Sequence, residues 1–190
     1  QHQRTPAERR RSIESATQAV AGTRDALAAA GYSVPLVTGA GTGSFVLEAA
    51  SGVWGELQAG SYLFMDADYA ANQTDPEAPA FEHALFVKSQ VMSRSENHAV
   101  CDAGHKSHAI DSGLPAVAWP SGLVFANGGD EHGILRAAVP GTELPELGET
   151  VWLIPGHCDP TVNLHDGCVG VRGGLAAQPG AVHAAVELGA

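Results

Sequence analysis

The first thirty residues carry the pattern of one long surface helix. Thr5 is a candidate N-cap and Pro6 occupies the first helical position. Apolar residues then recur at near-helical spacing, at Ile13, Ala16, Val20, Leu27 and Ala28. Gly31 follows as a stop signal, so the sequence predicts a helix over residues 5–30.

The next forty residues alternate between strand-like and helix-like patterns. Residues 34–41 (VPLVTGAG) form a short apolar run ending in glycines, which is typical of a buried parallel strand. A helical stretch over 44–57 leads to a second apolar run at 61–66 (SYLFMD). Helix, strand, glycine loop, helix and strand in this order predict an α/β segment with a parallel sheet.

After Tyr69 the pattern changes to short strands separated by Gly, Pro and Asp. Turn signals at roughly ten-residue intervals indicate an all-β sandwich or barrel-like domain. The seven predicted strands lie within residues 83–94, 98–104, 116–120, 122–128, 132–139, 149–156 and 167–174.

These patterns divide the chain into an α/β part at 1–72 and a β domain at 73–190. The one or two strands and two helices of the first part are too few to close a sheet and bury a core. We therefore expect this sequence to be the C-terminal portion of a larger protein.

Composition narrows the class of protein. Of 190 residues, 44% are hydrophobic and 16% charged, an ordinary globular balance, and the net charge of -11 disfavours nucleic-acid binding. The absence of a long apolar run or a signal peptide predicts a soluble, cytoplasmic protein. The three cysteines form neither a disulfide framework nor a four-cysteine zinc site, whereas nine histidines favour metal or proton chemistry.

A glycine-rich loop, TGAGTGS at 38–44, lies between a predicted strand and a predicted helix. Its glycines let backbone N–H groups approach an anion, and Thr42 and Ser44 offer hydroxyl donors, so the loop suits a phosphate group. It matches neither the dinucleotide-binding nor the Walker pattern. A glycine-rich turn without a ligand is the alternative interpretation.

His157 and Asp159 directly follow the apolar strand VWLI. On an extended segment they would project to the same side and Cys158 to the other, and imidazole with carboxylate suits Mn²⁺, Zn²⁺ or a similar divalent ion. Two protein ligands would leave positions open for water or substrate. The alternative is a pair that binds no ion, although three further candidate ligands lie at strand ends or in loops, at His132, His165 and Asp166.

Neither of the two lysines is predicted to be catalytic. Lys106 lies in a polar segment between His105 and His108, where a solvated or ion-paired lysine is favoured over a desolvated Schiff-base lysine. Lys88 alternates with apolar residues and is expected on the solvent face of a strand.

Together these motifs resemble the C-terminal half of bacterial-type D-threonine aldolases, which are pyridoxal-phosphate (PLP) enzymes of the alanine-racemase-like fold. The resemblance covers residues 30–175 and includes D-serine dehydratases and D-threo-3-hydroxyaspartate dehydratases as relatives. It rests on the motifs GAGTGS (39–44), SYLFMD (61–66), DAGHKSHAIDSGLP (102–115), DEHG (130–133) and, most specific, PGHCDPTVN (155–163).

The resemblance implies the last α/β units of a PLP-binding (β/α)₈ barrel followed by the β domain. It implies that Gly41, Thr42 and Gly43 bind the PLP phosphate, with a second contact from Gly60 and Ser61. It also implies that His157 and Asp159 are the catalytic metal ligands, with Mn²⁺ favoured and Zn²⁺, Mg²⁺ or Co²⁺ as alternatives. The Schiff-base lysine of the family would lie in the N-terminal barrel segment, outside this sequence, and Lys106 does not replace it.

The implied reaction is retro-aldol cleavage of D-threonine and other D-3-hydroxy-amino acids to glycine and an aldehyde, in a homodimer. Dehydration of D-serine or D-threo-3-hydroxyaspartate is the alternative, and in that branch the resemblance implies a cysteine two residues after the histidine. Asp159 at that position favours the aldolase and a harder ion. A more distant alternative is a non-catalytic β-rich binding module.

Overall fold

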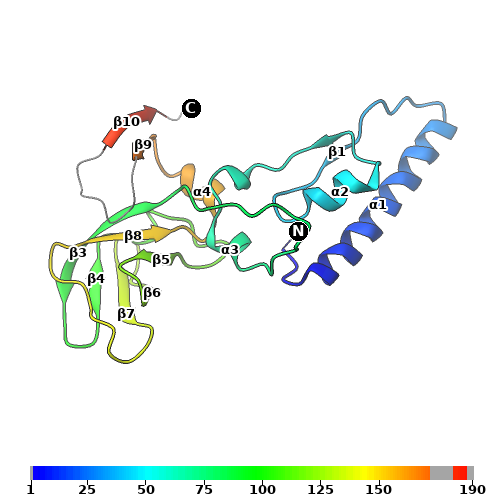
Figure 1. The fold of residues 1–190 in the computed structure, drawn as a ribbon. Helices are drawn as coiled ribbons and strands as arrows, with labels where there is room; N and C mark the ends of the chain where they lie inside the picture. Colours follow the sequence, from blue (N-terminus) through cyan, green and yellow to red (C-terminus); the bar gives the residue numbers. More distant parts are fainter. Residues whose placement is uncertain (1, 172–181, 188–190) are drawn as a thin grey trace. The chain divides into compact units, whose positions relative to one another are not determined.

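The computed structural model describes residues 2–171 and the backbone of 182–187. The chain separates into two compact units, Gln1–Glu82 and His83–Ala190. Each unit has its own secondary structure, shown in Figure 1. Within the described residues, no helix is both long and apolar enough to cross a membrane.

The first unit opens with the predicted helix, α1 (Pro6–Ala29). The Thr5 side chain accepts a hydrogen bond from the Glu8 backbone N–H, and the Glu8 carboxylate accepts one from the Thr5 N–H. This reciprocal capping box, with Pro6 at the first position, fixes where the helix begins. After the helix, Gly31 adopts a positive φ of 87°, as the stop signal predicts.

A short parallel strand pair is present in this unit, but its second strand lies at 56–57 rather than in the predicted run at 61–66. β1 (Thr38–Gly39) pairs in parallel with β2 (Glu56–Leu57), and α2 (Phe45–Ser51) connects them. The helix predicted over 44–57 stops early because Gly52 takes the left-handed conformation at φ 69°. The chain thereby returns to the extended β2 before residue 57.

The strand predicted at SYLFMD is wrong. Ser61–Leu63 form a 3₁₀ turn, η1, and Asp66 caps the short helix α3 (Ala67–Ala70) by accepting the Tyr69 N–H at 2.8 Å. A six-residue apolar run has too little periodicity to separate a strand from helical turns. The capping carboxylate at Asp66 favours the turns.

In the second unit, all seven strands predicted from turn spacing are present. Six form one antiparallel sheet in the order β5-β8-β3-β4-β7-β6, whose edge strands β5 and β6 also contact each other, so the sheet is nearly closed into a barrel. The six are β3 (Val87–Arg94), β4 (Ala99–Cys101), β5 (Ala116–Trp119), β6 (Leu123–Asn127), β7 (Gly133–Ala137) and β8 (Thr150–Ile154).

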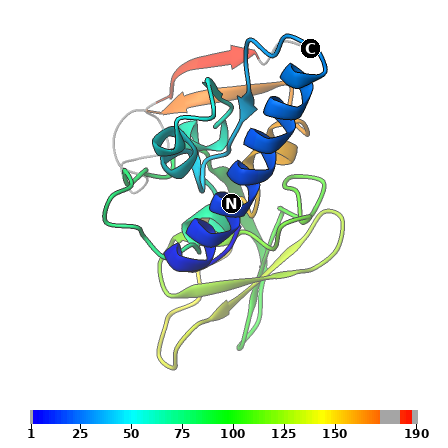
Figure 2. The same ribbon diagram turned by 90° about the vertical axis from the view of Figure 1, so that its right-hand side faces the viewer.

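Two further elements follow the barrel strands. α4 (Cys158–Val162) comes directly after β8, and β9 (Gly167–Val171) pairs antiparallel with β10 (Val182–Glu187). This pair forms its own two-stranded sheet and appears in Figure 2 as the adjacent orange and red arrows.

The barrel core follows the two-residue period of its strands. On β8, Val151 and Leu153 are buried while the intervening Trp152 is only partly covered. The other fully or nearly fully buried apolar side chains come from β3, β4, β6 and β7 and the loop after β4, and they are Val91, Ala99, Cys101, Ala103, Leu123, Phe125 and Leu135.

One histidine is buried with this core. His108 has no solvent exposure, and its ring meets the Phe125 ring edge-on at a centroid distance of 5.2 Å. Its Nε2 atom has no hydrogen-bond partner within the described residues. Burial therefore lowers the pKa of His108 below its usual value, because a charged ring would lose its hydration there.

The buried histidine predicts a pH-dependent stability. Above about pH 6.5 His108 is neutral in both states. Below that pH the unfolded chain takes up a proton that the folded chain resists, so the free energy of unfolding falls by at most about 1.4 kcal/mol per pH unit. Urea unfolding between pH 7.5 and 5 should show a shallower pH dependence for His108→Leu than for the unchanged protein. Identical slopes would mean that the native state protonates this ring without penalty.

Candidate functional site

His157 and Asp159 lie at the end of β8, where α4 begins. His157 has an extended backbone (φ -139°, ψ 126°) and occupies the N-cap position of α4. The predicted extended segment over 157–159 is wrong, because Cys158 and Asp159 already form the first helical turn. Pro160 is compatible with that turn, since its missing N–H would have had no helical partner there.

The two predicted metal ligands are nevertheless close together. His157 Nε2 lies 3.8 Å from Asp159 Oδ2. Atoms that share one cation through bonds of about 2.1 Å lie roughly 3.0 to 3.5 Å apart. Asp159 is 67% exposed, so a small rotation of its side chain closes the difference. The pair therefore fits a divalent cation with one nitrogen and one oxygen ligand.

The prediction that the Cys158 side chain projects away from this pair is wrong. Its side chain is fully buried, and its Sγ donates to Asp159 Oδ1 at 3.3 Å. The helical turn places consecutive side chains about 100° apart rather than on opposite faces. Cys158 consequently supports the Asp159 carboxylate from the interior of the second unit.

A second acidic residue completes the arrangement around His157. Asp111 Oδ2 lies 2.9 Å from His157 Nδ1, and Ser112 Oγ lies 3.2 Å from the same carboxylate oxygen. The hydrogen bond with His157 holds the pKa of Asp111 below its usual value. Sequence reasoning missed this contact, because Asp111 is 46 residues from His157 and lies in an otherwise polar loop.

The pairing of β5 with β8 explains why these distant residues meet. Ala116 lies opposite Ile154 in an antiparallel register, so the residues preceding β5 run beside the residues following β8. The backbones come very close there, since a Cβ on Gly156 would overlap the Gly113 carbonyl oxygen. Glycine at position 156 therefore lets the His157 loop lie against the Asp111 loop.

Further hydrogen bonds join these two loops. The buried Thr161 accepts the Ala109 N–H at 3.1 Å and donates to the His157 carbonyl at 2.7 Å. His165 Nε2 contacts the Ser107 carbonyl at 2.9 Å. The loop after β4 is thereby fixed along the whole α4 segment.

The other candidate ligands do not enlarge the pair into a cluster. Among residues 2–171, no group of three or more His, Cys, Asp or Glu side chains is arranged to hold a metal ion. His132, His165 and Asp166 thus do not complete a closed site in this part of the chain. The open site with two protein ligands, His157 and Asp159, stays a prediction.

Lys106 is a surface residue, as predicted. Its side chain is 61% exposed and its Nζ donates to Glu131 at 2.8 Å, which raises the pKa of Lys106. Beside it, His105 Nε2 lies 2.6 Å from Asp130. These contacts fix the start of the loop after β4, and the exposed ammonium lacks the desolvation that a Schiff-base lysine requires.

In the first unit, the structure brings the two predicted phosphate segments together. The Thr42 hydroxyl accepts the Tyr62 N–H at 2.9 Å, which joins the loop 41–43 to residues 60–61. Gly41, Thr42 and Ser61 are buried, whereas Gly60 is exposed. The Gly41 carbonyl accepts the N–H groups of Ser44 and Phe45, each at 3.0 Å, and so shapes the turn into α2.

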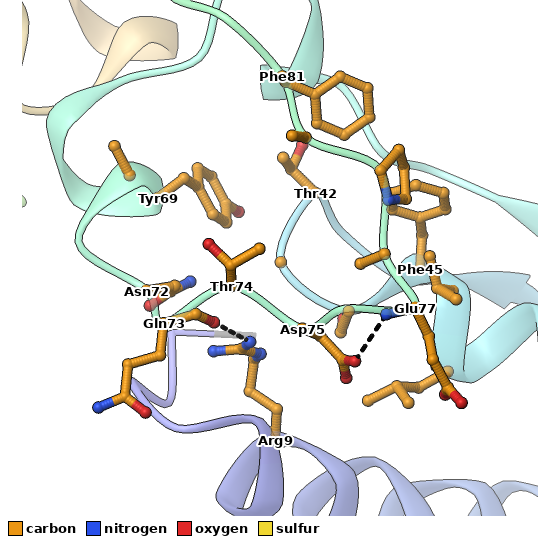
Figure 3. A pocket seen from close by; sticks show the side chains of 18 of the residues that line it. Arg9, Thr42, Phe45, Tyr69, Asn72, Gln73, Thr74, Asp75, Glu77 and Phe81 are labelled. Atoms are coloured by element: carbon orange, nitrogen blue, oxygen red, sulfur yellow. Dashed lines mark hydrogen bonds between the residues drawn. The ribbon is translucent and has the colours of Figure 1, made fainter.

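A pocket of about 250 Å³ lies beside this loop and includes Thr42 and Gly43 in its wall. Figure 3 shows Thr42 and Phe81 on one side and Arg9, from α1, on another. The Arg9 guanidinium is buried and donates to the Gln3, Arg4 and Gln73 carbonyls. Arg9 therefore holds backbone in place, and the glycine loop is the part of the wall suited to a phosphate.

Comparison with known proteins shows which proteins this chain resembles. Residues 84–171 match the family model described as a putative serine dehydratase domain. D-threonine aldolase from Arthrobacter sp. is 46% identical over 176 residues, covering 92% of this chain and 46% of that protein. The crystal structure of D-threonine aldolase from Filomicrobium marinum superposes with a TM-score of 0.88 at 47% identity, covering 98% of this chain and 49% of that one.

The chain is homologous to the C-terminal region of the D-threonine aldolases. It spans about half the length of these aldolases. A 3-hydroxy-D-aspartate aldolase from Paracoccus denitrificans is 40% identical over 179 residues, with 92% of this chain and 46% of that protein covered. D-threo-3-hydroxyaspartate dehydratase from Delftia sp. HT23 shares the fold, with a TM-score of 0.77 at 22% identity over 96% of this chain and 52% of that one.

The close approach of the two loops in this aldolase homologue predicts the effect of Gly156→Ala. The added methyl group would overlap the Gly113 carbonyl, so one backbone must move, at a cost of about 1–3 kcal/mol in the free energy of unfolding. Gly22→Ala is the control, because nothing lies within 4 Å of the place its methyl group would take and alanine favours a helix. Denaturant unfolding measures both variants, and equal stability of Gly156→Ala and unchanged protein would contradict the packing described.

Proposed function

We propose that the chain forms the metal-binding β domain and the PLP-phosphate loop of an enzyme that cleaves D-threonine to glycine and acetaldehyde. The observation that carries the proposal is the His157–Asp159 pair at the end of β8, supported by 46–47% identity to D-threonine aldolases. The proposal extends to other D-3-hydroxy-amino acids, because a close homologue is named for 3-hydroxy-D-aspartate.

The residues present fit both implied groups. His157 and Asp159 would supply the nitrogen and oxygen ligands that suit Mn²⁺. Gly41 and Thr42 are buried and Gly43 is half-buried in a turn beside a pocket, with Ser61 next to them. When bound, PLP supplies an electron sink for breaking the Cα–Cβ bond, and a divalent cation lowers the pKa of the substrate β-hydroxyl.

The chain's own residues would act by binding and orientation. The turn at 41–43 would fix the cofactor phosphate through backbone N–H groups and the Thr42 hydroxyl. His157 and Asp159 would leave coordination positions open for the substrate hydroxyl and water, because no third protein ligand is arranged beside them in the described residues. The Schiff-base lysine is expected in a segment outside this sequence, and a homodimer is expected from the resemblance.

Dehydration of a D-3-hydroxy-amino acid is the second candidate. The matching family model carries a dehydratase name, and a cysteine thiol contacts the proposed metal ligand Asp159. Two observations favour cleavage instead: the dehydratase structure shares only 22% identity, and the residue two positions after His157 is the carboxylate Asp159. The reaction products separate the two candidates, since cleavage gives glycine and dehydration gives a 2-oxo acid.

Asp159→Ala tests the metal role. In the full-length protein, loss of one of two protein ligands should lower D-threonine cleavage at least 100-fold, whereas bound PLP should be retained. Asp166→Ala removes a nearby exposed carboxylate and serves as the control, with activity within about twofold of the unchanged protein. Chelator should abolish glycine formation and added Mn²⁺ should restore it. Full activity of Asp159→Ala, or 2-oxobutanoate as the main product, would refute the aldolase proposal.

Gly41→Val tests the cofactor loop. A branched side chain in this buried turn should keep the backbone away from the phosphate and lower PLP retention severalfold after dialysis, while Mn²⁺ affinity is preserved. Absorbance of bound PLP near the visible edge measures retention. Unchanged PLP content in a folded Gly41→Val protein would contradict the assignment of this loop to the PLP phosphate. If the unchanged protein showed no PLP absorbance band, a non-catalytic binding module would be favoured.

A further inference from the structure

We infer that Asp111 is a positioning residue that holds His157 in the tautomer and orientation needed to bind a divalent cation through Nε2. The inference rests on the metal site of the proposed function. It assigns a role to a residue in the loop before β5 that contacts the proposed metal ligand His157.

The first step concerns the proton on the imidazole. An aspartate carboxylate is ordinarily ionised at neutral pH and can then only accept a hydrogen bond. Asp111 Oδ2 lies 2.9 Å from Nδ1 of His157, so Nδ1 carries the proton and donates it. In this tautomer Nε2 has the lone pair that a metal requires, and Nε2 is the ring atom that faces Asp159 at 3.8 Å.

The second step concerns the rigidity of the carboxylate. Ser112 Oγ lies 3.2 Å from Asp111 Oδ2 and 3.3 Å from His157 Nδ1, so the hydroxyl sits between the two groups. The β5–β8 register and the Gly113–Gly156 approach fix the backbone that carries all of them. The imidazole plane is thereby set by the fold before any ion arrives.

The third step separates positioning from stabilisation. Asp111 is 52% exposed, and exposed ion pairs contribute about 0–1 kcal/mol to folding. Loss of a carboxylate that orients a metal-binding histidine typically weakens metal binding 10- to 100-fold. The Asp111–His157 contact should therefore contribute little to the free energy of folding and much to the affinity for an ion held by His157.

A matched control exists in the same unit. His105 and Asp130 form a second histidine–carboxylate pair, with Nε2 and Oδ1 2.6 Å apart and the aspartate 67% exposed. This pair lies near β4 and β7, and its histidine is not a proposed ligand. Removing either carboxylate deletes one charge and one histidine hydrogen bond, but only Asp111 contacts the proposed metal ligand.

The experiment measures Mn²⁺ binding to the full-length protein by the electron paramagnetic resonance signal of free Mn²⁺. We expect Asp111→Ala to weaken binding 10- to 100-fold, Asp130→Ala to remain within about twofold of the unchanged protein, and Asp159→Ala to lose most binding. Thermal midpoint and PLP content should be similar in all four proteins. Asp111→Ala with unchanged Mn²⁺ affinity would overturn the inference if Asp159→Ala still loses binding.

Failure of the proposed function would look different, because Asp159→Ala would then bind Mn²⁺ as well as the unchanged protein. A second measurement covers an Asp111 variant that does not fold. Nitrogen-15 NMR of the metal-free, unchanged protein should show His157 protonated at Nδ1 and unprotonated at Nε2. A ring protonated at Nε2 would overturn the inference directly.

Discussion

The antiparallel pairing of β5 with β8 is the constraint on which the candidate metal site depends. Because Ala116 lies opposite Ile154, the chain entering β5 and the chain leaving β8 must run side by side. Gly156 permits the close backbone approach, and the buried Thr161 joins the two loops by hydrogen bonds. Asp111 and His157, 46 positions apart, meet as a consequence of this register.

Much of the fold could be predicted from the sequence because its signals are local. Thr5 and Pro6 mark the start of α1, and Gly, Pro and Asp separate strands whose alternating side chains fill the barrel core. The SYLFMD run misled the prediction because six apolar residues lack a decisive period, and the side chain of Asp66 favours a helical turn. Strand order and barrel curvature depend on pairings between distant residues, which no local pattern contains.

The candidate site shows the same division between local and non-local information. Residue chemistry and spacing indicated His157 and Asp159, and the glycines indicated the loop at 38–44. The backbone at 157–159 was predicted as extended, whereas α4 begins at Cys158 and buries its thiol against Asp159. The role of Asp111 could not be predicted, because it depends on the β5–β8 register rather than on neighbouring residues.

The most direct test of this account is the position of Mn²⁺ in crystals of the full-length protein, determined from anomalous scattering. The account predicts one ion bound by His157 Nε2 and an Asp159 carboxylate oxygen, with Asp111 still hydrogen-bonded to Nδ1. An ion bound between Nδ1 and Asp111, or no ion at this pair under conditions that support activity, would contradict it.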